Sequence, residues 1–366
     1  MSPSSSPSDD PFAFLTLAGP VAALTSRRAW IAALLEVEAA LAAAQADAGE
    51  LPLADADAVA AVCDVARYDV DAIVEGAAAG GNLVIPLLPM VRALAGDHAD
   101  AVHRGATSQD VVDAGTALVV GRCADAVAAR LDDASGIVLA LAATHGDTPM
   151  IARTLGQHAV PTTFSAVTAR WGDGLAEAAA AVTGTSRPAV GLGGPSGDGT
   201  SYGPAHHIVL AGLAARLELP VAPLARHGQR SGTAAVAGAW GLAASVVAKI
   251  ALDVVLLAQD DVGELREAAP GAGGSSSMPH KHNPIAAIAA RAAAMQAPGY
   301  VATLLQAAGS GELERAAGAW HAEWPALNGL LRTTGSAVEW LHASLDRLVV
   351  EPARMAENLS RSEERR

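Results

Sequence analysis

Apolar residues recur at the three-to-four-residue spacing of a helix through most of the chain. The first such segment starts after Ser26, a residue type that caps helices, and stops at Gly49 and Pro52. No alternation of apolar and polar residues persists long enough to indicate a strand. The pattern therefore predicts an all-α protein with a loop-rich stretch at 76–89. Further helices are expected at 107–131, 135–143, 161–182, 233–265, 284–305 and 324–345.

The longest apolar run, 240–258, bears on the choice between a membrane span and a buried helix. Lys249 and Asp253 interrupt this run, and a membrane-spanning helix rarely carries two charged residues near its centre. The run therefore predicts a helix that is apolar on most faces and is buried in a large bundle. Because helices this long and this apolar cannot be solvated alone, we also expect bundling between subunits.

Composition narrows the class of protein. The chain is 51% hydrophobic but only 3% aromatic, so its core must be built from Ala, Val and Leu. A formal net charge of −14 opposes nucleic-acid binding but does not exclude a small anionic substrate held by a few local cations. Cys63 and Cys123 form no disulfide framework. The first ten residues lack the features of a signal peptide, so we expect a disordered start and a cytoplasmic protein without membrane partners.

The run 273–284, Gly-Gly-Ser-Ser-Ser-Met-Pro-His-Lys-His-Asn-Pro, carries the strongest chemical signal. Its serines, 275–277, can donate or accept protons on a flexible arm, and Lys281 and Asn283 are suited to hold a carboxylate beside them. Lysine is otherwise present only at Lys249, so its retention at Lys281 indicates a point charge that arginine would not supply. The alternative is a Ser/Gly linker that ends in a turn.

Two further segments carry polar residues near expected helix starts. In 103–110, the hydroxyls of Thr107 and Ser108 and the free N–H groups of a helix start make an anion site, and His103 adds charge nearby. In 153–163, Thr154 and Gln157 offer hydrogen bonds to a carboxylate or carbonyl group. A simple N-cap explains the first segment equally well, and a polar helix entry explains the second.

Together these segments resemble the fumarase/aspartase superfamily over about 28–358. The pattern Gly-Ser-Ser-x-Met-Pro-x-Lys-x-Asn in 274–283 is a signature of that superfamily, and the Thr-Ser-x-Asp and Thr-x-x-Gln-x-Ala segments are its two other signature regions. The resemblance implies an N-terminal helical domain (1–102), a central long-helix domain (103–345) and a remnant of a C-terminal domain (346–366) that is largely missing. It also implies a homotetramer with a 20-helix core and active sites shared between three subunits.

Within the superfamily, the segments 314–324 and 81–86 resemble the bacterial 3-carboxy-cis,cis-muconate cycloisomerases. Lyases that expel an amine typically have a histidine directly after the threonine of the second region, where this chain has Leu155. An amine leaving group needs a proton as it departs, whereas a carboxylate has a pKa near 4 and leaves without one. Leu155 therefore favours a lactone-forming enzyme. The implied activity is conversion of 3-carboxy-cis,cis-muconate to 4-carboxymuconolactone, in protocatechuate breakdown.

The resemblance also implies a role for each candidate residue. Ser275 is expected to transfer the proton on the carbon next to a carboxylate, while Lys281 and Asn283 stabilise that carboxylate as it takes up charge. Neither a metal nor an organic cofactor is expected, and the partner is a small polycarboxylate. The other expected substrate-binding residues are Ser276, Thr107, Ser108, Thr154, Gln157, His103 and Arg315. Two alternatives stay open: another lyase of the superfamily, such as adenylosuccinate lyase, and a non-catalytic helical scaffold.

Overall fold

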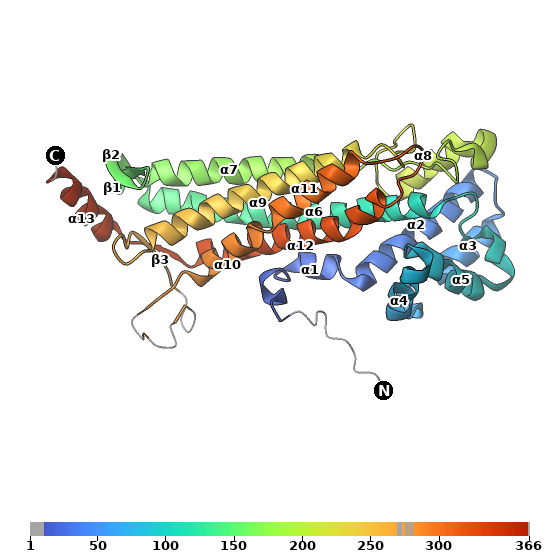
Figure 1. The fold of residues 1–366 in the computed structure, drawn as a ribbon, viewed down its shortest axis with the longest axis horizontal. Helices are drawn as coiled ribbons and strands as arrows, with labels where there is room; N and C mark the ends of the chain where they lie inside the picture. The colour runs from blue at the N-terminus through green and yellow to red at the C-terminus, as the bar shows by residue number, and fades with distance from the viewer. Residues whose placement is uncertain (1–10, 269–272, 275–277, 279–280, 365–366) are drawn as a thin grey trace.

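The computed structural model describes residues 11–268, 273–274, 278 and 281–364. Figure 1 shows an elongated molecule in which long helices run side by side between two ends. One end carries α2–α5 and α8, and the other carries a β-hairpin and α13. The helices are α1 (Pro20–Leu24), α2 (Arg27–Asp47), α3 (Leu53–Val62), α4 (Val70–Gly80), α5 (Val84–Ala95), α6 (Ser108–His145), α7 (Ser165–Gly184), α8 (His206–Arg216), α9 (Ser231–Leu257), α10 (Ile285–Ala294), α11 (Ala297–Ala308), α12 (Ala319–Asp346) and α13 (Pro352–Glu363). Short 3-10 helices occupy η1 (Ala13–Leu15), η2 (Val65–Arg67), η3 (Gly96–Ala101) and η4 (Thr200–Ala205).

Helix α6 runs along the whole bundle. Its 38 residues extend about 57 Å at 1.5 Å per residue. It packs against α2, α7 and α12, while α9 packs against α7, α10, α11 and α12. Trp171 on α7 and Trp240 on α9 are fully buried, and Trp171 Nε1 donates a hydrogen bond of 2.8 Å to Asp253 Oδ2. Most of the remaining core is Ala, Val and Leu, as the composition predicts.

The predicted all-α class is confirmed, and several helix limits follow the sequence signals. Ser26 Oγ accepts from Ala29 N at 3.2 Å at the start of α2, and Gly49 follows its end in a left-handed conformation. The predicted break between 131 and 135 is wrong, because α6 continues through it. Leu131, Ala134 and Val138 extend its buried stripe at helical spacing, and neither glycine nor proline occurs at 131–135.

Two other expectations about local structure are corrected. Short antiparallel strands do occur: β1 (Pro149–Thr154) pairs with β2 (Gln157–Thr163), and β3 (Leu265–Glu267) pairs with β4 (Leu348–Val350). They are too short or too irregularly buried to show a period of two. The stretch 76–89 is largely helical, because Asn82 Oδ1 accepts from Val84 N at 3.0 Å and starts α5. Pro86 falls in the first turn of α5, where no N–H is needed.

The expected helix at 284–305 is divided into α10 and α11 at Met295–Gln296, and the expected helix at 233–265 ends earlier, at Leu257. The predicted domain boundary at 102 falls between η3 and α6, and the boundary at 345 falls in the last turn of α12. These boundaries stay predictions.

Two helices, α2 and α9, are long and apolar enough to cross a membrane by length and composition alone. That is weak evidence, because the core helix of a soluble protein passes the same test. The apolar window of α2 is 61% buried within the chain, and that of α9 is 39% buried. Lys249 and Asp253 on α9 form an ion pair with each other. The expected burial of α9 is thus only partly provided within the chain.

Candidate active site

The first candidate segment forms the N-terminus of α6. Ser108 is the first residue of this helix and Thr107 precedes it, so the backbone N–H groups of the first turn lie beside both hydroxyl-bearing residues. Asp110 completes the turn: its Oδ2 accepts from Thr107 N at 3.0 Å, as in a capping box. Both Thr107 and Ser108 are partly exposed. The predicted helix start at these residues is therefore confirmed, and its anion-binding role stays a prediction.

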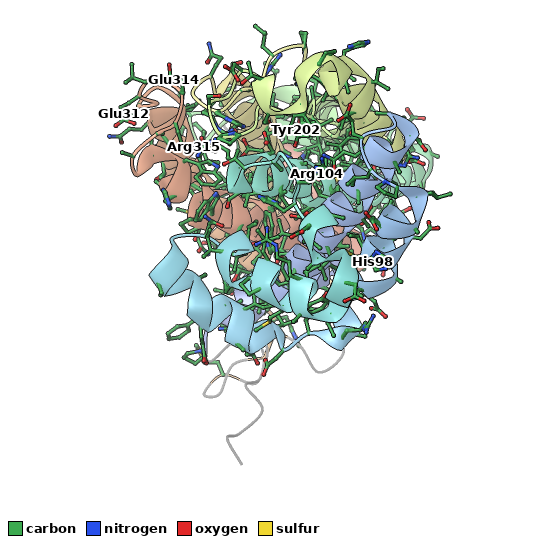
Figure 2. The ribbon with its side chains drawn as sticks, turned by 90° about the vertical axis from the view of Figure 1, so that its right-hand side faces the viewer. His98, Arg104, Tyr202, Glu312, Glu314 and Arg315 are labelled. Carbon is green, nitrogen blue, oxygen red and sulfur yellow. The ribbon has the colours of Figure 1, made fainter. Side chains whose placement is uncertain are left out.

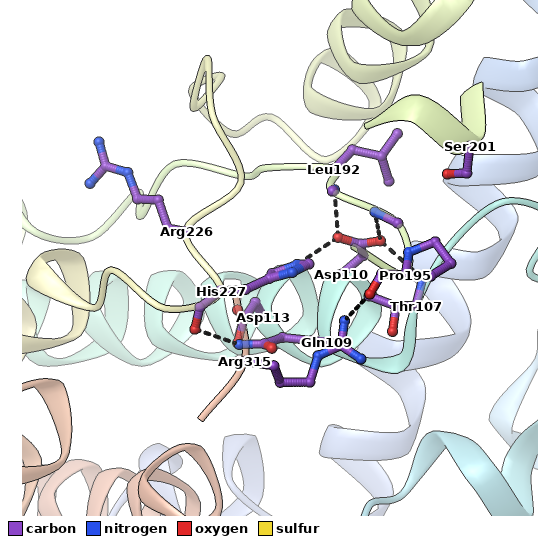
Figure 3. Close-up of polar contacts among 12 residues, drawn as sticks. Thr107, Gln109, Asp110, Asp113, Leu192, Pro195, Ser201, Arg226, His227 and Arg315 are labelled. Atoms are coloured by element: carbon purple, nitrogen blue, oxygen red, sulfur yellow. Dashed lines mark hydrogen bonds and ion pairs between the residues drawn. The ribbon is translucent and has the colours of Figure 1, made fainter. Parts of the chain in front are cut away.

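Asp110 joins this helix start to two loops (Figure 3). Its buried carboxylate accepts from Gly193 N at 2.8 Å and from Gly194 N at 2.9 Å. His227 Nε2 lies 2.9 Å from Asp110 Oδ1. The loop needs glycine here, since Gly194 has a φ of 65° and a Cβ on it would lie 2.3 Å from Ser201 Oγ. Sequence reasoning named Asp110 only as a motif position and missed its partner His227.

Replacing Asp110 by asparagine is expected to destabilise the fold by about 2–3 kcal/mol, because the amide cannot accept all the hydrogen bonds that the buried carboxylate accepts. The matched control is Asp125→Asn on the same helix, whose carboxylate pairs with Arg187 in solvent. That exposed pair contributes at most about 1 kcal/mol. Thermal unfolding of both variants measures the difference; equal midpoints would contradict the role of Asp110 as an anchor.

A second buried network lies one turn further along α6 and was also missed. The Arg230 guanidinium contacts Asp113 at 2.6 and 3.0 Å and Glu323 at 2.6 to 3.1 Å. Trp320 Nε1 donates to Asp113 Oδ1 at 3.1 Å. Burial alone would lower the pKa of Arg230, but the two carboxylates outweigh it and raise that pKa. Burial raises the pKa of the Glu323 carboxyl, and Arg230 opposes that rise. The network ties α6, α9 and α12 together.

Arg315 and His103 lie at the same end of the molecule as Thr107 and Ser108. Arg315 donates to Pro195 O at 3.2 Å, and Pro195 belongs to the loop that Asp110 holds (Figure 3). The Arg315 side chain, labelled in Figure 2, is exposed, and within the described residues no carboxylate forms an ion pair with it. His103 Nδ1 lies 2.7 Å from Glu38 Oε1. Four of the candidate residues are therefore gathered at one end.

Thr154 and Gln157 lie at the opposite end of the bundle (Figure 1). They are the last residue of β1 and the first residue of β2, so they flank the two-residue turn Leu155–Gly156. Both turn residues have positive φ values, 51° and 78°, and the Leu155 side chain is fully exposed. This segment is a hairpin, which corrects the alternative of a polar helix entry.

An ion pair anchors that hairpin. Arg153, next to Thr154, donates to both carboxylate oxygens of the buried Glu264, at 2.7 and 2.9 Å. Asn358 on α13 donates to the same carboxylate at 2.8 Å. Because Arg153 is held on one side, the exposed turn and its two flanking side chains are presented away from the body of the subunit.

The third candidate segment joins β3 to α10. Ser275 and Ser276 lie outside the described residues. Glu267 on β3 accepts from Ala286 N and Ala287 N at 3.1 and 2.8 Å, so it caps α10 and draws the two ends of the segment together. Asn283 Nδ2 donates to Gly273 O at 3.0 Å. Lys281 is exposed, and no carboxylate in the described part of the chain pairs with it.

One subunit does not bring the candidate residues together. The helix α6 separates Thr107 from the β1–β2 hairpin by about 57 Å. A site that uses Thr107, Thr154 and Lys281 at once therefore requires more than one copy of the chain. Within the described residues, no group of three or more His, Cys, Asp or Glu side chains is placed to hold a metal ion.

Comparison with known proteins gives the family and the fold class of this chain. The sequence profile of a protein family described as Lyase matches residues 21–299. The chain belongs to this family, which is part of the fumarase/aspartase superfamily, and the predicted membership and enzyme class are confirmed.

Three individual proteins are similar to this chain over most of its length. The chain is 40% identical over 333 residues to the 3-carboxy-cis,cis-muconate cycloisomerase of Bradyrhizobium diazoefficiens, covering 89% of this chain and 74% of the relative. It is 38% identical to the nitrosuccinate lyase of Streptomyces davaonensis, covering 93% and 74% of the two chains. Its fold matches the crystal structure of the 3-carboxy-cis,cis-muconate lactonizing enzyme from Pseudomonas putida with a TM-score of 0.89 and 32% identity, covering 96% and 80%.

Proposed function

We propose that this protein is a cycloisomerase that converts 3-carboxy-cis,cis-muconate to 4-carboxymuconolactone, a step in protocatechuate breakdown, without a metal or an organic cofactor. The observation that carries the proposal is the 40% identity to a cycloisomerase over 89% of the chain. The turn at Leu155 supports it, because a leucine side chain has no proton to give to a leaving amine. In the reverse reaction the leaving group is a carboxylate, which departs unprotonated.

The candidate residues suit that chemistry. One substrate carboxylate oxygen adds to a double bond, and the electron pair moves to the carbon next to a second carboxylate. That carbon takes a proton from Ser275, which water then reprotonates. The substrate trianion thus takes up one proton from solvent and becomes the lactone dianion, and the two are isomers when compared as the free acids. Lys281 and Asn283 hold the second carboxylate as it gains charge. The remaining carboxylates are held by the other expected residues, namely Ser276, Thr107, Ser108, Thr154, Gln157, His103 and Arg315.

A homotetramer with sites shared between three subunits accounts for the separation of these residues. The exposed apolar side chains of α9 support it, since Leu242 and Leu256 are 41% and 46% exposed in the single subunit. Covering such a face with helices of other subunits would remove it from water. Association would also bring the hairpin end of one subunit to the α6 start of another.

The wild-type protein is expected to consume 3-carboxy-cis,cis-muconate, and loss of the conjugated-diene absorbance measures that turnover. Prior dialysis against EDTA is expected to leave the rate unchanged, because the proposed chemistry uses only protein groups. Parallel assays with nitrosuccinate and adenylosuccinate test the other lyase activities. Turnover of either compound without activity on the muconate would replace the proposed substrate, and a folded tetramer inactive on all three and binding no polycarboxylate would favour the scaffold.

A further inference from the structure

A buried carboxylate lies directly behind His103. Glu38 is in the middle of α2, its side chain has no exposed surface, and its Oε1 is 2.7 Å from His103 Nδ1. Its second oxygen, Oε2, is buried without a hydrogen-bond partner. Within the described residues, no other cationic side chain pairs with Glu38. Because a buried carboxylate is costly unless a hydrogen-bond donor faces it, His103 Nδ1–H is the group that compensates Glu38.

The backbone of His103 is also constrained. Its φ of 62° lies in the left-handed region, which is uncommon for residues other than glycine. Gln45 Nε2 donates to Arg104 O at 2.8 Å. Since Glu38 and Gln45 are seven residues apart, they lie on one face of α2. This helix therefore holds the segment at two points, one on the His103 side chain and one on the adjacent backbone.

Two ionisable side chains near Glu38, those of Cys63 and Tyr202, remain uncharged. Burial raises the pKa of the Cys63 thiol to about 12, and the charge of Glu38 adds to the rise. Burial also raises the pKa of Tyr202, and the charges of Asp110 and Glu38 add to it. Tyr202, labelled in Figure 2, packs its ring against Gly105, where a Cβ would lie 3.0 Å from it. Both groups therefore stay neutral near neutral pH.

Pairing through Nδ1 leaves the other ring nitrogen of His103 available. Nε2 has no hydrogen-bond partner among the described residues, and the side chain keeps 10% of its surface exposed. His103 lies four residues before Thr107, on the segment that leads into the N-terminus of α6. A charged imidazole held by one nitrogen presents the other N–H in a defined direction, as a donor for an anionic group.

We propose that Glu38 is a positioning residue for His103. It fixes the orientation of the imidazole and places a carboxylate behind it, so that Nε2–H donates to a substrate carboxylate beside Thr107 and Ser108. Glu38 is covered by protein and does not touch the substrate. The proposal rests on the polycarboxylate substrate of the proposed function.

A double-mutant cycle tests the pairing on the assembled protein. Glu38→Gln and His103→Gln are each expected to lower kcat/KM for 3-carboxy-cis,cis-muconate by roughly 10- to 100-fold, the range for losing one charge-assisted hydrogen bond. The variants should mainly raise KM and change kcat less, because carboxylate binding precedes the chemical step. The double variant should be no slower than His103→Gln, since Glu38 acts only through that residue. The matched control is Glu36→Gln, which removes the half-exposed pair of Glu36 with Arg122 and should change kcat/KM less than about twofold.

Fully additive losses in the double variant, or normal kinetics in His103→Gln, would overturn the proposal. If Glu38→Gln fails to assemble, Glu38→Asp replaces it, because the shorter carboxylate keeps the charge but lengthens the gap to Nδ1. If the wild-type protein does not turn over the muconate, the proposed function fails separately. The cycle is then measured as the Kd of propane-1,2,3-tricarboxylate by calorimetry, where a non-additive loss supports the pairing and equal values in all variants reject it.

Discussion

Ser275→Ala is expected to lower kcat by roughly 10²- to 10⁴-fold, the usual contribution of a positioned proton-transfer group. Alanine removes the hydroxyl that exchanges a proton with the substrate carbon and leaves a small side chain in its place. The KM should change less, because Lys281 and Asn283 still hold the neighbouring carboxylate. Steady-state kinetics on the muconate measure both constants, and size-exclusion chromatography checks that the variant keeps the oligomeric state of the wild type.

A neighbouring serine is the matched control for this variant. Ser277 occupies the variable position of the signature Gly-Ser-Ser-x-Met-Pro-x-Lys-x-Asn, so Ser277→Ala removes an identical group from the same run. It is expected to keep most of the wild-type activity. Substantial residual turnover in Ser275→Ala would assign the proton transfer to another group, and equal losses in the two variants would indicate a general effect on the segment.

Mixed tetramers are expected to regain activity that neither parent variant has. The variant Thr107→Val/Ser108→Ala alters the start of α6. The variant Thr154→Val/Gln157→Leu alters the β1–β2 hairpin, which lies about 57 Å away in the same chain. If different subunits supply these regions to a site, some sites in a random mixture receive only intact regions. For a one-to-one mixture that fraction is about a quarter. Co-expression with two purification tags isolates the mixed tetramers for assay.

The control uses two changes from the same region. Thr154→Val mixed with Gln157→Leu should regain nothing, because both side chains flank the same turn and every site then carries one of the two changes. Recovery in this control would indicate that the single changes are too mild. Absence of recovery in the first mixture would contradict shared sites and leave the separation along α6 without a functional role.

Much of the helical architecture could be predicted from local signals. The Ser26 cap and the Gly49 stop define α2 because both act within one turn of the chain. Such local signals fail where contacts between residues far apart in the chain determine the structure. Leu131, Ala134 and Val138 face the core, so α6 continues through a stretch that resembles a helix end in sequence. The strand β3 exists because β4 lies beside it, eighty-odd residues later in the chain.

The candidate site divides in the same way. Its motif residues could be predicted because hydroxyl, amide and ammonium groups that lie close together in sequence are typical of carboxylate binding. The groups that hold them could not be predicted. His227 pairs with Asp110 over 117 residues and Arg230 pairs with Glu323 over 93, and no local pattern links such partners. Glu38 lies inside the first predicted helix, and no local pattern in the sequence links it to His103, which it contacts in the structure.

The sequence by itself therefore determined the class of protein, the predominance of helices and the chemistry of the three polar segments, because helix periodicity and side-chain chemistry are local properties. Tertiary structure alone decided where those segments lie. It placed Thr107 and Thr154 at opposite ends of α6, turned the Leu155 segment into a hairpin, and put buried carboxylates behind His103 and Arg153. These outcomes depend on contacts between residues far apart in the chain, whose free energies no short stretch of sequence contains.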